Sequence, residues 1–133
     1  DLIDNMCLQK GVNFDMERSY QYDIVVVGGG TAGVAAAVGA AKAGAKTLLV
    51  ERNAYLGGEA ANSGVNCFCG FYTCGSDPVR VVKGIGQLVL DEMRALGPTI
   101  AEEISASVNR EIIFQPEDLK CALDNLLEKE HVD

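Results

Sequence analysis

The sequence predicts an α/β fold in which helices cover a parallel sheet, and three observations carry that prediction. Two short apolar runs, residues 23–27 and 47–50, are rich in valine, isoleucine and leucine, as in strands buried on both faces of a parallel sheet. Between them, residues 33–43 are crowded with alanine, a strong helix former. Strand, helix and strand together span 28 residues, which fits one compact right-handed βαβ unit.

Elements beyond this unit are also indicated. Residues 85–96 carry apolar side chains on one helical face. Residues 111–114 are expected to form a short strand, and Pro116 to open a helix with acidic residues in its first turn. Val132 and Asp133 have the character of the first residues of another strand. The long stretch between the βαβ unit and the helix at 85–96 has no clear period, so a functional loop is expected there.

Composition limits the class of protein. A chain of 133 residues with 48% hydrophobic and 23% charged residues fits one globular domain and not a disordered chain. The net charge of −8 argues against a nucleic-acid partner, whose binding depends on Lys and Arg. No apolar run approaches the length of a membrane span. Five cysteines without a recognisable secretion signal predict reduced thiols and a cytoplasmic location.

A glycine motif lies between the first predicted strand and its helix. Gly28, Gly30 and Gly33 match the spacing G-x-G-x-x-G, with Thr31 and Ala32 between the last two. The first glycine permits a tight turn, the second lets a pyrophosphate approach the backbone, and the third lets the helix pack against the strand. The N-terminus of the helix then offers N–H groups and a positive dipole end to the anion.

The second predicted strand ends at an acidic residue, Glu51, which lies 21 residues after Gly30. This spacing suits a carboxylate that accepts hydrogen bonds from the hydroxyls of an adenosine ribose. A negative charge at this position would repel a 2′-phosphate, so NADP is disfavoured. The motif leaves FAD and NAD open. The pair Gly57-Gly58 favours FAD, because an NAD-binding domain normally passes from this acid directly into another helix.

Residues 22–64 resemble the N-terminus of the FAD-dependent oxidoreductases related to the fumarate reductase and succinate dehydrogenase flavoproteins. These proteins open with a strand, GGGxAG, an alanine-rich helix, a strand ending in ER, as at Glu51-Arg52, and a glycine-pair segment, as at Gly57-Gly58. Residues 65–72 and 115–120 are similar to later parts of that family. The resemblance implies a lead-in segment, residues 1–21, and the N-terminal portion of a Rossmann-like FAD-binding domain, residues 22–133, whose parallel sheet is incomplete in this chain.

The same resemblance implies the site and the partners. The family's substrate domain has no counterpart here, so no catalytic residue is assigned, and completion by the rest of the protein or by a companion chain is expected. A small-molecule substrate and non-covalent FAD are implied, because Gly57 stands where several relatives tether the flavin through histidine. The residues implied to bind FAD are Gly28, Gly30, Thr31, Ala32, Gly33, Glu51, Arg52, Gly57 and Gly58.

The sequence leaves other functions open. The chain could be a dinucleotide-binding module that holds FAD or NAD without catalysis, or part of a tRNA-modifying flavoprotein, which its acidic surface disfavours. Cys67, Cys69 and Cys74 lie close in sequence, but their spacing matches zinc sites poorly and no fourth ligand is near. They are expected to be small, partly buried thiols with no metal or redox role. His131 is expected at the surface, near a helix C-terminus.

Overall fold

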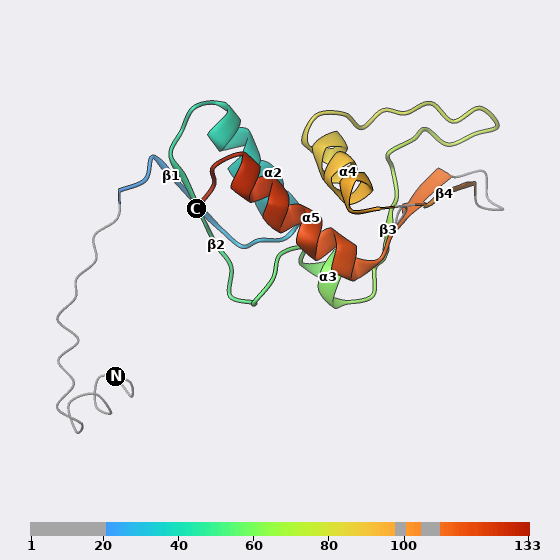
Figure 1. Cartoon of the computed structure of the whole chain (residues 1–133). Helices are drawn as coiled ribbons and strands as arrows, with labels where there is room; N and C mark the ends of the chain where they lie inside the picture. The colour runs from blue at the N-terminus through green and yellow to red at the C-terminus, as the bar shows by residue number, and fades with distance from the viewer. Residues whose placement is uncertain (1–20, 98–100, 105–109) are drawn as a thin grey trace, which may run out of the picture.

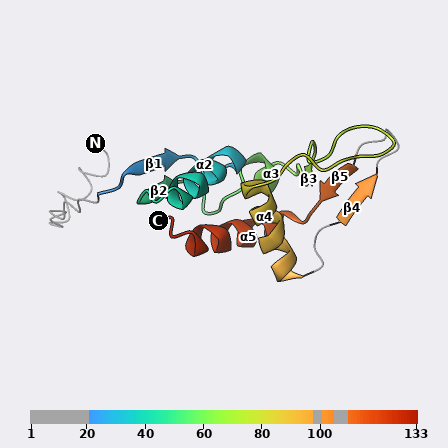
Figure 2. The same cartoon turned by 90° about the horizontal axis from the view of Figure 1, so that it is seen from above.

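The structure is a computed structural model that describes residues 21–97, 101–104 and 110–133. A short helix predicted over residues 2–11 and nearly all of the lead-in segment lie outside the described residues. Figure 1 shows two small sheets at opposite ends of the described chain, with helices between them, and the view from above in Figure 2 agrees.

The first sheet is the predicted βαβ unit. Strand β1 spans Ile24–Val27, helix α2 spans Thr31–Lys42 and strand β2 spans Thr47–Val50. The two strands are parallel, with Ile24 opposite Thr47 and Val27 opposite Val50. Parallel strands need a crossover, and α2 supplies it. The predicted unit is therefore confirmed, with bounds that differ by two residues or fewer.

Asp133 extends this sheet by a third backbone segment. Its N–H donates to the carbonyl of Thr47 at 3.0 Å, and its own carbonyl accepts from the N–H of Leu49 at 2.7 Å. This alternation is the hydrogen-bond pattern of a parallel pair in which Asp133 lies opposite Leu48. Helix α5, Pro116–Lys129, brings the chain back to β2 (Figure 1). These two hydrogen bonds fit the expected start of a further strand at Asp133.

The core lies between the first sheet and three helices. Helix α4, Ile85–Leu96, packs on α5, and both contact α2. The bounds of α4 are those expected from its apolar face, and α5 begins at the predicted proline. Side chains that are nearly or fully buried come from all three helices and from the segment after β5: Val34, Ala37, Val38, Met93, Phe114, Leu119, Leu123 and Leu126.

The prediction that the strands are buried on both faces was wrong for the described chain. Val26 and Leu49 pack against the core, but Val25 is 54% exposed and Val27 is 82% exposed. Successive side chains of a strand point to opposite faces. One face of the β1–β2 sheet therefore packs on the helices, while the other is covered by no residue that the structure describes.

A second sheet was not expected. Three strands form an antiparallel sheet in the order β3-β5-β4. Strand β3 spans Cys67–Phe68, β4 spans Ala101–Ile104 and β5 spans Arg110–Ile113. The strand predicted at 111–114 is present one residue earlier, but its partners were not foreseen. A short helix, α3, Glu59–Asn62, follows the pair Gly57-Gly58. Within the described ranges, no helix has the length and apolar character to cross a membrane.

Candidate functional site

The first glycine loop turns the chain from β1 into α2. Gly28 has a φ of +103°, which side-chain-bearing residues rarely adopt, and its N–H donates to the carbonyl of Val50 at 2.7 Å. Gly30 is the extended residue before the helix, and its carbonyl accepts the first helical hydrogen bond from Val34 at 2.9 Å. The loop is thus shaped by backbone geometry and tied to the end of β2.

Two glycines of this loop have different surroundings. A Cβ added at Gly33 would run into the carbonyl oxygen of Gly28, so this position must stay bare for α2 to start against β1. A Cβ added at Gly30 would meet only the Cα of Gly58, at 3.9 Å. Gly30 therefore borders open space, as a backbone that receives a ligand must.

The pair Gly57-Gly58 lies directly against the glycine loop between β1 and α2. The N–H of Gly57 donates to the carbonyl of Gly29 at 2.9 Å. Gly58 has a φ of +52°, and a Cβ there would come within 3.0 Å of the Cα of Gly30. The fold therefore brings together the two glycine segments that the sequence places almost thirty residues apart.

Glu51, directly after β2, binds the first loop through its carboxylate. One oxygen accepts from the N–H of Gly29 at 2.6 Å, and the other accepts from the N–H of Asn53 at 2.8 Å. The hydrogen bonds from Asn53 and Gly29 hold the pKa of Glu51 below its usual value. Each carboxylate oxygen keeps a further lone pair for a ligand hydroxyl. The role of Glu51 in fastening the loop was missed, because spacing alone does not show which backbone groups a side chain meets.

Two hollows flank the site. One, of about 220 Å³, is lined by Glu51, Tyr55 and Leu56 together with Asp124 and Asp133. The other, of about 230 Å³, has mainly apolar walls and begins at Thr31, the first residue of α2; its walls include Phe68 and Phe71.

The remaining predicted site residues are accessible. Thr31 and Ala32 occupy the exposed first turn of α2, whose N–H groups have no carbonyl partner within the helix. No acidic side chain lies in that turn, so its positive dipole end is not offset there. Arg52 is exposed next to Glu51. All nine predicted residues therefore surround one region, at the ends of β1 and β2.

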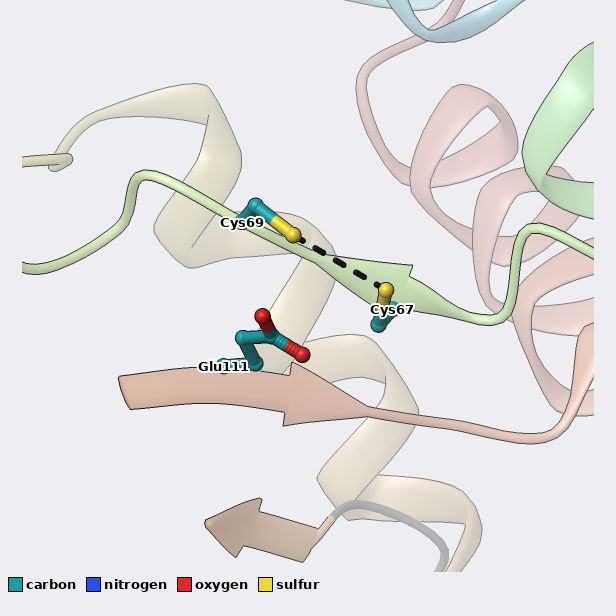
Figure 3. Close-up of side chains that lie close together, drawn as sticks. All are labelled: Cys67, Cys69 and Glu111. Atoms are coloured by element: carbon teal, nitrogen blue, oxygen red, sulfur yellow. Dashed lines mark hydrogen bonds between the residues drawn. The ribbon is translucent and has the colours of Figure 1, made fainter. Parts of the chain in front are cut away.

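The cysteines form a separate cluster at the other sheet. Figure 3 shows Cys67 on β3, Cys69 just after that strand, and Glu111 on the neighbouring strand β5. The two Sγ atoms are 3.8 Å apart. Hydrogen bonding to Cys67, followed by burial, raises the pKa of Cys69. Cys67 is half-buried, but Cys69 and Cys74 are exposed, so the expectation of partial burial holds for Cys67 alone.

Glu111 was missed by the sequence reasoning, because it comes 42 positions after Cys69 and meets it only through strand pairing. His131 is exposed just after α5, as expected.

A βαβ unit with a glycine-rich turn, a bare helix N-terminus and an acid at the end of the second strand is typical of dinucleotide-binding α/β domains. Residues 23–133 match the family described as "FAD dependent oxidoreductase". The chain belongs to this FAD-dependent oxidoreductase family, as its resemblance indicated, and a flavin cofactor follows from that membership.

Named relatives are consistent with this family. The chain is 32% identical over 108 residues to a thiamine thiazole synthase of Aeropyrum pernix, covering 72% of this chain and 36% of the relative. It is 32% identical over 103 residues to a digeranylgeranylglycerophospholipid reductase of Methanoculleus marisnigri, covering 77% of this chain and 20% of the relative. The chain therefore spans about a third or less of the length of these relatives.

Solved structures share the fold. THI4 of Thermovibrio ammonificans aligns with a TM-score of 0.52 at 16% identity, over 99% of this chain and 45% of that protein. A 3-ketosteroid-Δ4-(5α)-dehydrogenase of Rhodococcus jostii aligns with a TM-score of 0.52 at 23% identity, over 90% of this chain and 38% of that protein. At these identities, the likeness supports the Rossmann-like fold and nothing finer.

Proposed function

We propose that this chain binds the ADP half of FAD in a larger oxidoreductase. The observation that carries the proposal is the contact between the two glycine segments, which leaves bare backbone facing the exposed N-terminus of α2. Gly28, Gly30 and Gly33, with Thr31 and Ala32, would hold the pyrophosphate. Backbone N–H groups and the helix dipole favour its negative charge without a lysine.

Glu51 would orient the adenosine half. Its ionised carboxylate would accept hydrogen bonds from the ribose hydroxyls while it keeps its bonds to Gly29 and Asn53. The hollow beside it has a volume of about 220 Å³ and lies where the adenosine would enter. Arg52 and the pair Gly57 and Gly58 would line the path of the dinucleotide, because they border the same region.

FAD, when bound, supplies the capacity to accept and pass on a pair of electrons. The residues of this chain would bind and orient the cofactor. A small-molecule substrate and the reacting side chains would belong to the remainder of the protein or to a companion chain, which would also cover the exposed face of the β1–β2 sheet. We place the protein in the cytoplasm, because the four cysteines that the structure describes are free and a chain with five cysteines suits a reducing compartment.

The cofactor proposal is tested on the full-length protein. Purified protein should be yellow and carry about one flavin per chain, and protein stripped of flavin should take up FAD in preference to NAD. Colourless protein that ignores FAD and binds NAD would show that the dinucleotide is wrong.

Non-covalent attachment is a separate proposal. Gly57, at the position of the histidine tether in several relatives, has no nucleophilic side chain, and His131 lies in a different element, just after the C-terminal end of α5. Cys67, Cys69 and Cys74 are the alternative nucleophiles. Denaturing the flavin-loaded protein in acid should release all the flavin. Flavin that remains on a peptide of this chain would contradict the proposal.

A further inference from the structure

The outer face of the second sheet carries two thiols and a carboxylate in one place. In the antiparallel register, Phe68 lies opposite Ile112, which is fully buried, so this pair faces the core. Side chains alternate along a strand. Cys67, Cys69 and Glu111 therefore share the opposite face, as Figure 3 shows. Their ligand atoms all lie within 4.8 Å of one another.

We propose that Cys67, Cys69 and Glu111 form a site for a thiophilic divalent cation of the Zn²⁺ class. The two Sγ atoms and one carboxylate oxygen would be three of four tetrahedral ligands, and water or an incoming ligand would take the fourth position. Thiolates favour zinc over the hard cations Mg²⁺ and Ca²⁺, which prefer oxygen ligands.

The separation of the two sulfur atoms suits a shared zinc ion and is too long for a disulfide. Two thiolates on a tetrahedral zinc ion, each at about 2.3 Å from it, are about 3.8 Å apart. The Sγ atoms of Cys67 and Cys69 are 3.8 Å apart. A disulfide would require about 2.05 Å. The same geometry places a carboxylate oxygen about 3.6 Å from each sulfur, and a carboxylate oxygen of Glu111 already lies within 4.8 Å of both sulfur atoms.

The expectation that these cysteines bind no metal depended on the absence of a further nearby ligand in the sequence. Strand pairing supplies that ligand, because Glu111 lies next to Cys69 on the adjoining strand. Three protein ligands with one open position is the usual arrangement of a zinc site that keeps a bound water.

A bound ion would have a structural consequence. Strand β3 consists of Cys67 and Phe68 alone, so few backbone hydrogen bonds hold it to β5. The Phe68 ring, between the two cysteines in sequence, lies 4.4 Å from the ring centre of Phe114 and lines the apolar hollow that begins at Thr31. An ion that joins β3 to β5 would fix this wall of the hollow.

The first experiment measures zinc bound to the reduced, full-length protein after loading with Zn²⁺ and gel filtration. The wild type should retain one zinc ion more per chain than Cys67→Ser or Cys69→Ser. Glu111→Gln should weaken zinc binding roughly tenfold or more, since even the loss of an outer-shell partner costs 10–100-fold. Cys74→Ser, an exposed cysteine just outside the cluster, is the matched control and should retain the wild-type amount. Equal amounts of zinc retained by the wild type, Cys67→Ser and Cys69→Ser would overturn the proposal.

The second experiment uses only wild-type protein, so a folding defect cannot confuse it. The reduced protein is alkylated with iodoacetamide, with and without Zn²⁺, and the cysteine peptides are quantified by mass spectrometry. Zn²⁺ should protect Cys67 and Cys69, while Cys74 and Cys121 stay reactive. Unchanged labelling of Cys67 and Cys69, or a disulfide between them in protein purified without oxygen, would overturn the proposal.

Discussion

The two ends of the molecule build their candidate sites in opposite ways. At the β1–β2 end, the site consists mainly of backbone: bare glycines, helical N–H groups and one carboxylate that holds the loop. At the β3–β5 end, the cluster consists of side chains, and Glu111 comes from a strand far in the sequence from the two cysteines. A site made of backbone has a recognisable local spacing, whereas a site made by strand pairing does not. The difference predicts that the two sites can be lost independently.

The largest expected effect is the loss of flavin in Gly30→Val. A Cβ at this position meets only the Cα of Gly58, at 3.9 Å, so the branched side chain should occupy the space of the pyrophosphate without unfolding the loop. The full-length variant should purify colourless and yet keep the zinc content of the wild type. Measured flavin content equal to the wild type would remove this loop from the site, and loss of both ligands would show that the two ends are coupled.

Gly33→Ala should act through the fold instead. Its Cβ would collide with the carbonyl oxygen of Gly28, and overpacking of this kind costs about 1–3 kcal/mol of stability. Gly39→Ala is the matched control on the same helix, because its Cβ would make only an ordinary contact with Ile85 at 3.6 Å. Chemical denaturation of both variants should separate them. Equal stability would contradict the close approach of α2 to the first loop.

Glu51→Ala should weaken FAD binding roughly tenfold to a hundredfold, the scale of a hydrogen bond to a charged group. The wild type should also be sensitive to acid here. Hydrogen bonds lower the folded-state pKa of Glu51 from its usual 4.5, so its stabilisation is complete above 4.5 and is lost as pH falls through the lowered value. As pH is lowered, the free energy of unfolding should therefore fall less steeply in the variant than in the wild type. A steeper fall in the variant would contradict the lowered pKa of Glu51 in the folded state.

The smallest effect is expected between the two ends, where Lys129 on α5 donates to Glu92 on α4 at 2.6 Å. The lysine side chain is 61% exposed and that of Glu92 is 14% exposed, so the charge of Lys129 stays in contact with water, and a surface ion pair of this kind contributes about 0.2–1 kcal/mol. Lys129→Ala should lower the free energy of unfolding by no more than that, and added salt should shrink the difference. A larger loss would show that α4 and α5 depend on this pair and not on their apolar contact.

Local patterns account for what could be predicted. The βαβ unit, α4 and α5 follow from apolar periodicity and helix signals within short windows, and the glycine positions follow from the spacing of one motif. The antiparallel sheet could not be predicted, because β3 has only two residues and no alternating pattern. Glu111 and the bond from Gly29 to Glu51 were missed for a related reason: each depends on which distant segments the fold places in contact.

The pairing of Asp133 with β2 has a consequence for protein synthesis. The edge of β2 begins to be paired only when Asp133 arrives, 84 positions after Leu49. At a translation rate of roughly 5–20 residues per second, a nascent β1–α2–β2 unit would wait about 4–17 s for that partner. An unpaired strand edge can recruit other chains. We therefore expect this edge to stay open to pairing with other chains while the nascent chain is still on the ribosome.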